Sequence, residues 1–248
     1  MDLSLPLQHW DMFLHGVWVS MLLTVLSVAA GFLLALPGAL AQQRRSRLAF
    51  IPRGYAYFFR GTPLLVQTFL IYYGLGQFEW VRESWAWVFL KEAWWCALIA
   101  FSLNSGAYQT EILRGAFAMT PKGELEGAKA LGLSERQTTW LVLLPSSLRR
   151  ALPQYGNEVV FQLHSSVVAS VITIQDILGA GRTLNARYYV AYEGFVTAAV
   201  LYMALTFLLV GLFRLLERRY LRHLLPPEEL KKLQKGTAAG AAFGTARV

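Results

Sequence analysis

Long uncharged stretches dominate the chain, and the short segments between them carry most of its charges. The long stretches are residues 16–43, 61–78, 93–110, 159–175 and 194–213, which hold 28, 18, 18, 17 and 20 residues. A helix needs about 20 mostly apolar residues to cross a bilayer, and about 17 to 25 are tolerated. The pattern therefore predicts an all-α membrane protein with about five transmembrane helices.

Lys and Arg gather on one side of these predicted spans. Because successive spans place alternate connections on the same side, residues 42–60, 114–150 and 214–248 share one side and hold 5, 6 and 8 basic residues. The other side holds 4. Cytoplasmic connections are enriched in Lys and Arg, so the N-terminus is predicted outside and the C-terminus in the cytoplasm. Nucleic-acid binding is the weaker interpretation of the net charge of +8, because the basic residues flank spans instead of forming one patch.

Nothing in the sequence indicates a soluble domain beside the spans. We expect residues 1–235 to form a single transmembrane domain, and the small-residue-rich residues 236–248 to form a disordered tail. Five helices are few to enclose a polar path, so we expect the chain to pair with another such subunit.

A charged segment, residues 119–147, interrupts the apolar pattern between the third and fourth predicted spans. It predicts a short helix over residues 122–131, a left-handed cap at Gly132, and a second short helix capped by Ser134 with Gln137 as its capping-box partner. Pro145 is expected to end that second helix. The segment fits either an amphipathic helix on the lipid headgroups or a docking helix for a cytoplasmic partner.

The residues of this segment resemble a known motif. Glu126-Gly127-Ala128, followed by Gly132 and by Val142-x-Leu144-Pro145, is similar to the EAA loop in membrane subunits of bacterial ATP-binding-cassette (ABC) importers. Gly127 stands where the usual pattern has alanine. The resemblance covers nearly the whole chain and is closest to the histidine and arginine permease subunits of polar amino acid importers, through residues 59–78, 95–116 and 155–178.

The resemblance implies a fold, partners and a cellular location. The fold is that of a type I ABC importer permease, multi-pass in the bacterial inner membrane, and the EAA loop at residues 119–147 couples it to a separate ATPase. The implied partners are an ATPase dimer, a second permease subunit (identical or related), a periplasmic solute-binding protein and the amino acid substrate. The substrates implied are polar, cationic L-amino acids: arginine, histidine, lysine and ornithine. The coupling residues would be Glu126, Ala128, Ala130, Leu131, Gly132 and Arg136.

The chain itself is not expected to be an enzyme or to bind a cofactor. It has no G-x-x-x-x-G-K-[ST] sequence, so ATP and Mg²⁺ are expected in the partner ATPase. His9, His15 and His223 lack the spacing of a metal site. An ion-gradient-driven transporter is the alternative function, although such folds usually have more helices and inverted repeats.

Ionisable residues near the spans are the first candidates for the substrate path, because a charge at membrane depth is costly and is usually functional. Glu111 ends the third predicted span and Glu158 precedes the fourth. Either carboxylate could compensate the charge of a cationic amino acid. The alternative is a structural ion pair with Arg114 or Arg149.

Uncharged polar residues complete the predicted path. His164 and Ser165, in the fourth span, are predicted to hydrogen-bond the substrate, although a lone histidine in an apolar helix is more often a packed group. Gln67 of the second span, Asn104 of the third span and Asn157 beside Glu158 are further candidates. Residues 60–63 are interpreted as a structural hinge at the cytoplasmic face, with Pro63 near a helix start.

Overall fold

The computed structural model describes residues 4–43 and 49–221, and this part of the chain is helical. The long helices are α2 (Trp10–Gln43), α7 (Ala93–Ala118), α10 (Leu144–Ser165) and α12 (Ala191–Tyr220). The shorter α-helices are α1 (Ser4–Gln8), α3 (Phe50–Gly61), α4 (Leu64–Phe69), α5 (Glu79–Arg82), α6 (Trp87–Leu90), α8 (Lys122–Ala130), α9 (Glu135–Thr138) and α11 (Ile177–Tyr188). Two π-helical turns, η2 (Leu70–Gly74) and η4 (Thr139–Leu143), and two 3₁₀ segments, η3 (Leu75–Gln77) and η5 (Ser166–Ile172), continue them. The predicted tail, residues 236–248, lies outside the described residues.

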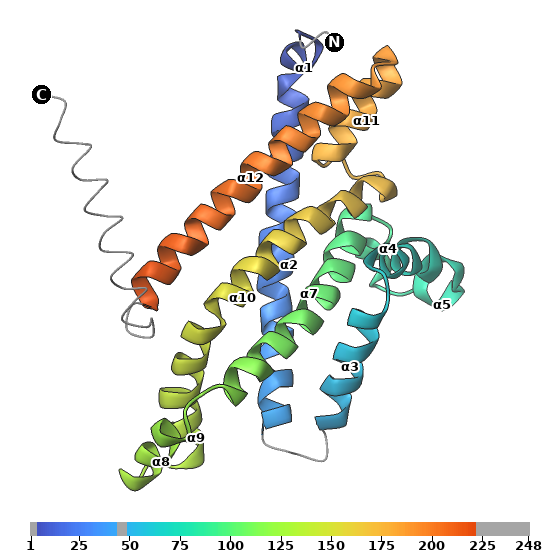
Figure 1. The fold of residues 1–248 in the computed structure, drawn as a ribbon. Coiled ribbons are helices and arrows are strands. Elements are labelled where there is room, and N and C mark those ends of the chain that lie inside the picture. The colour runs from blue at the N-terminus through green and yellow to red at the C-terminus, as the bar shows by residue number, and fades with distance from the viewer. Residues whose placement is uncertain (1–3, 44–48, 222–248) are drawn as a thin grey trace, which may run out of the picture.

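The long helices form one packed bundle (Figure 1). Helix α2 packs against α7, α10 and α11, and α12 packs against α10 and α11. By length and composition α2 and α12 can each cross a membrane, and the bent pair Glu135–Ile172 and Ile177–Tyr188 is a third candidate, with 41° between its parts. The predicted spans 16–43 and 194–213 fall inside α2 and α12.

The predicted second span, residues 61–78, is not one regular helix. Helix α3 ends at Gly61, Thr62 is extended, and Pro63 caps the start of α4. Pro63 is thus near a helix start, as predicted. The break does not lie at the end of the bundle, however, because the Asn104 amide in the middle of α7 donates to the Phe59 carbonyl 3.0 Å away.

The predicted fourth span, residues 159–175, also differs from the structure. Helix α10 begins at Leu144, well before the apolar run, and continues as η5 up to Thr173, which has a left-handed backbone with φ 74°. Asp176 then caps α11. The uncharged run therefore spans a corner between two helices and is not one straight segment.

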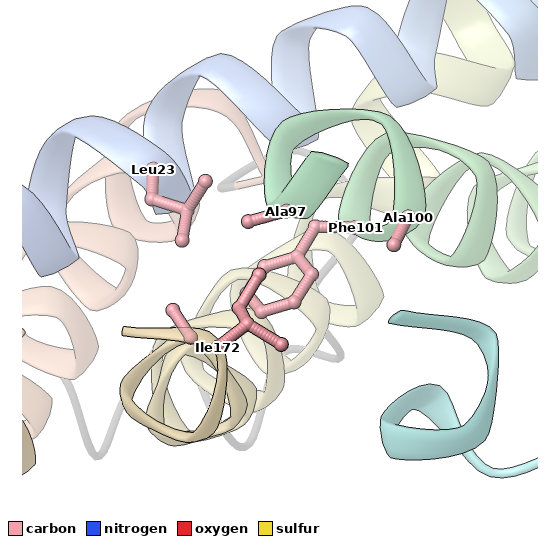
Figure 2. Packing of buried hydrophobic residues seen from close by; sticks show 6 residues of the cluster. Leu23, Ala97, Ala100, Phe101 and Ile172 are labelled. Carbon is pink, nitrogen blue, oxygen red and sulfur yellow. The ribbon is translucent and has the colours of Figure 1, made fainter. Parts of the chain in front are cut away.

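A hydrophobic cluster holds α2, α7 and η5 together. Figure 2 shows Leu23 of α2, Ala97, Ala100 and Phe101 of α7, and Ile172 of η5 packed side by side. Farther along the same two helices, Gly31 and Gly106 bring the backbones into contact: a Cβ built on Gly31 would lie 2.8 Å from the backbone nitrogen of Gly106. The polar residues of α7 next to Gly106 are consequently held at a fixed position against α2.

Candidate functional site

A cavity of about 540 Å³ opens between α7 and α10. Three residues of the predicted substrate path line it: Glu111 of α7, and Asn157 and Glu158 of α10. Two arginines, Arg60 of α3 and Arg150 of α10, share its wall. The structure thus brings charges of both signs to one cavity of a size typical for small-molecule sites.

A chain of hydrogen bonds positions the Glu158 carboxylate. Only 6% of Glu158 is exposed, and its Oε1 accepts a hydrogen bond of 2.7 Å from the Ser105 hydroxyl. Ser105 Oγ in turn accepts from Gln109 Nε2 at 3.0 Å, and the same Nε2 donates to the Val28 carbonyl of α2 at 2.9 Å. Three helices therefore fix this carboxylate. The alternative of an ion pair with Arg149 or Arg114 does not apply to Glu158, because no such pair occurs between these described residues.

Glu111 forms the ion pair with Arg114 that was predicted as the alternative to a substrate role. Its Oε2 accepts from Arg114 Nε at 2.9 Å and from Arg114 Nη2 at 2.7 Å. Arg60 Nη1 lies 3.8 Å from the same oxygen, and the Arg60 guanidinium lies 5.3 Å from the centre of the Tyr108 ring. Arg60 was not among the predicted path residues. Its position directly before the Gly61–Pro63 break is the one feature of the sequence that could have indicated its place at the cavity.

Gln67 and Asn104, also predicted for the substrate path, do not line this cavity. Gln67 Nε2 donates to the carbonyls of Phe59 and Thr62 at 2.9 and 3.0 Å, and its Oε1 accepts from Asn104 Nδ2 at 3.1 Å. Both side chains are buried, and they satisfy backbone oxygens that the break between α3 and α4 leaves without helical partners. Their described contacts are structural.

His164 and Ser165 lie at the end of α10 and are outside the cavity as well. His164 is exposed on the side of α10 that meets α12, where its Nε2 lies 2.9 Å from the Thr206 hydroxyl. Ser165 is half-buried. The hydrogen bond to Thr206 agrees with the alternative to a ligand role, but the exposed ring of His164 is not packed as that alternative expected.

Asp176 is a buried carboxylate that is not among the predicted site residues. Its Oδ1 caps α11 by accepting from the Gly179 amide at 2.8 Å, and its Oδ2 accepts from the Tyr202 hydroxyl of α12 at 2.8 Å. A Cβ on Gly16 of α2 would lie 2.8 Å from the Asp176 carbonyl oxygen. Asp176 therefore ties three helices at one corner, and the Gln-Asp before Ile177 is a cap signal that could have indicated it.

The charged segment folds largely as its sequence predicts. The capping box of Ser134 and Gln137 is present, and Gly132 has φ 79° after helix α8. The prediction that Pro145 ends the second helix is wrong. The π turn η4, in which the Leu144 amide bonds to the Thr139 carbonyl, widens the helix just before Pro145 and relieves the clash of the proline ring, so the helix continues as α10.

Most of the predicted coupling residues are available for contact. Glu126, Ala130, Gly132 and Arg136 are exposed, and Leu131 is 83% exposed. Ala128 differs: it is buried, on the side of α8 that packs against η4. It therefore supports α8 from within the chain and does not face outward.

Within residues 4–43 and 49–221, no group of three or more His, Cys, Asp and Glu side chains is arranged to hold a metal ion. The geometry offers a charged cavity between α7 and α10 and an exposed helical loop at one end of the bundle.

Comparisons with known proteins agree with this arrangement. Residues 27–222 match the family described as "Binding-protein-dependent transport system inner membrane component". The chain is 42% identical to the octopine transport system permease protein OccM of Rhizobium meliloti (86% of this chain, 88% of the relative). It is 40% identical to the arginine ABC transporter permease protein ArtM of Haemophilus influenzae (86% and 94%). It is 39% identical to the histidine/lysine/arginine/ornithine transport system permease protein HisM of Escherichia coli K12 (85% and 90%).

A solved structure described as an amino acid ABC transporter with histidines has the same fold, with a TM-score of 0.78 and 29% identity over 88% of this chain and 99% of that one. Transport in this family depends on a binding protein and on an ABC ATPase. The binding protein and the ATPase are therefore the partners of the membrane subunit. The chain belongs to the family of binding-protein-dependent transport system inner membrane components, as the non-catalytic membrane permease of an ABC importer.

Proposed function

We propose that this chain is one of two permease subunits of an importer that moves cationic L-amino acids, including arginine, histidine, lysine and ornithine, at the expense of ATP. The observation that carries the substrate class is the similarity to relatives whose names contain arginine, or histidine, lysine, arginine and ornithine, at 40% and 39% identity. Dependence on a binding protein argues against the ion-gradient-driven alternative.

The cavity between α7 and α10 has the chemistry that such a substrate needs. An amino acid carries a carboxylate and an ammonium group, and both need compensating partners where water is scarce. The carboxylates of Glu158 and Glu111 suit the ammonium and a cationic side chain, while Arg60 suits the carboxylate. Asn157 supplies a neutral partner in the same wall. Glu158 is the stronger of the two acidic candidates, because Glu111 already has Arg114 as its partner.

We propose about five membrane crossings, with the N-terminus outside and residues 1–235 forming a single domain. In support of this topology, the ends of α2 and α12 lie toward the same end of the bundle as α8 and α9, and α1 lies at the opposite end (Figure 1). Among the described residues, α8 carries Lys122 and Lys129 at this end, and the last turn of α12 carries Arg218 and Arg219, as expected for a cytoplasmic side.

The EAA loop at residues 119–147 would dock in a groove of the ATPase, which binds ATP and Mg²⁺. The exposed Leu131 supports this, since a helix that docks in a partner's groove presents apolar side chains as anchors. Glu126, Ala130, Gly132 and Arg136 are also exposed on this loop. A second permease subunit, identical or related, and a periplasmic solute-binding protein would complete the importer.

Substitution of the cavity carboxylates tests the substrate class. In proteoliposomes that hold the assembled importer, Glu158→Gln is expected to lower uptake of labelled arginine by at least about tenfold, the effect of about 1.4 kcal/mol of lost interaction. Histidine uptake at a pH where its side chain is neutral should fall less. Arg149→Gln, a change of charge one residue outside the cavity wall, serves as the control. Equal arginine uptake by Glu158→Gln, Glu111→Gln and the parent would contradict the proposed site.

A further inference from the structure

One ion pair joins the exposed loop to the helix that lines the cavity. Both carboxylate oxygens of Glu124, in the first turn of α8, contact α10. Oε1 lies 3.0 Å from Arg150 Nη2, and Oε2 accepts a hydrogen bond of 2.6 Å from the Ser146 hydroxyl. Ser146 and Arg150 are four residues apart on α10, so they lie on one face of it. The carboxylate therefore binds one face of α10 at two successive turns.

The rest of the contact between α8 and the bundle is apolar. Ala128 is buried, and Leu125 packs against the cluster that contains Ala35, Leu113 and Leu143. Apolar contacts of this kind hold two surfaces together but tolerate sliding, whereas a hydrogen-bonded charge pair fixes their register. Within residues 4–43 and 49–221, Glu124–Arg150 is the only ion pair that joins α8 to another helix.

Arg150 belongs to two sites at once. It lines the small cavity beside Glu124, and it also lines the cavity that holds Glu111 and Glu158. Its side chain is 21% exposed, and its buried Nε has no hydrogen-bond partner. The charge of Arg150, which lines the cavity between α7 and α10, is thus balanced by Glu124 of α8. The adjacent Arg149 is exposed and makes no ion pair with the described residues.

We propose that Glu124 and Arg150 are positioning residues that connect movement of α8 to the cavity between α7 and α10. While the pair is closed, Arg150 is neutralised and α10 follows α8. When the ATPase displaces α8 and the pair opens, the free guanidinium at the cavity wall repels a cationic substrate and promotes its release. This inference rests on the proposed function of the chain.

The test is the number of arginine molecules transported per ATP hydrolysed by the complete importer, with its binding protein, in proteoliposomes. In Glu124→Gln and Arg150→Gln we expect this ratio to fall about tenfold, within the usual range of coupling between sites. The exchanged pair Glu124→Arg with Arg150→Glu should recover most of the ratio. Arg149→Gln, the matched control, should keep the ratio of the parent.

The ratio separates a link from a merely structural role. A variant that only folds or assembles poorly loses uptake and hydrolysis together, and its ratio stays unchanged. An unchanged ratio in both single variants, or an exchanged pair no better than the single variants, would overturn the link while leaving the proposed function intact. A parent importer that shows no ATP-dependent arginine uptake would overturn the proposed function, and this link with it.

Discussion

Replacing Gly106 by alanine tests the close contact between α2 and α7 that positions the cavity. A Cβ at this site would lie 2.7 Å from the Tyr55 hydroxyl oxygen, 3.1 Å from the Gly31 carbonyl oxygen and 3.3 Å from the Gly31 Cα. The first distance is too short for a carbon atom. Either the Tyr55 hydroxyl gives up its hydrogen bond to the Leu103 carbonyl, or the two helices separate.

The size of the effect follows from these contacts. Overpacking typically costs about 1 to 3 kcal/mol, a lost hydrogen bond adds about 1, and the better helix propensity of alanine returns about 1. The net expectation is that Gly106→Ala lowers the free energy of unfolding by about 1 to 3 kcal/mol. Because Ser105 precedes Gly106, the same shift would displace the hydrogen bond to Glu158 and lower uptake.

Thermal unfolding of the purified protein in detergent, followed by tryptophan fluorescence, measures this effect. Gly115→Ala is the matched control: it lies in the same helix, but a Cβ there meets no atom within 4 Å. We expect a lower midpoint for Gly106→Ala and an equal or higher one for Gly115→Ala. Adding Tyr55→Phe to Gly106→Ala should recover part of the loss. Equal midpoints for the two alanine variants would refute the close contact.

Three further substitutions test separate parts of the structure. Asp176→Ala leaves the Gly179 amide and the Tyr202 hydroxyl without their partner and should destabilise the chain by about 2 to 5 kcal/mol in the same thermal assay, whereas a loss below about 0.5 would contradict a tie between helices. Leu131→Asp should weaken co-purification of the ATPase by at least about tenfold while leaving the thermal midpoint unchanged, and undiminished co-purification would count against docking through this side chain. Gln67→Leu should destabilise by about 1 to 3 kcal/mol, because carbonyls at the α3–α4 break lose their donor; an unchanged midpoint would show that other groups satisfy them.

Local signals in the sequence predicted local features well. The capping box of Ser134 and Gln137 and the left-handed Gly132 depend on residues three or four positions apart, and both are present. The apolar runs of α2 and α12 were equally informative, because each helix is long and its sides are dominated by apolar residues.

The breaks in the helices could not be read from uncharged runs. Residues 61–78 and 159–175 contain no charge, yet the first contains π and 3₁₀ turns and the second contains the corner at Thr173. Side chains from other helices complete backbone hydrogen bonds at the α3–α4 break and near the corner, where Arg182 of α11 donates to the Ser170 carbonyl at 3.0 Å. Asn104 does so for the carbonyl of Phe59, which lies 45 residues earlier in the chain. Periodicity within one segment carries no information about a donor that distant.

The acidic residues of the candidate site could be predicted from the sequence, whereas the arginines that line the cavity with them could not. Glu111 and Glu158 were singled out because a carboxylate near a span is costly, and both line one cavity. Arg60 and Arg150 were not, because an arginine beside a span is also what topology alone demands. Polar residues inside spans, such as Gln67, were chosen for the path, although satisfying the backbone is the role that their contacts show.

A permease that moves cationic amino acids with energy from ATP does not need an ion gradient. The most direct measurement is uptake of labelled arginine into proteoliposomes that hold this chain with its co-purifying partners, with ATP on the ATPase side and all ion gradients collapsed. We expect uptake that requires both ATP and the added binding protein. Uptake that does not depend on ATP, and that appears only when a proton or sodium gradient is imposed, would contradict ATP-driven transport.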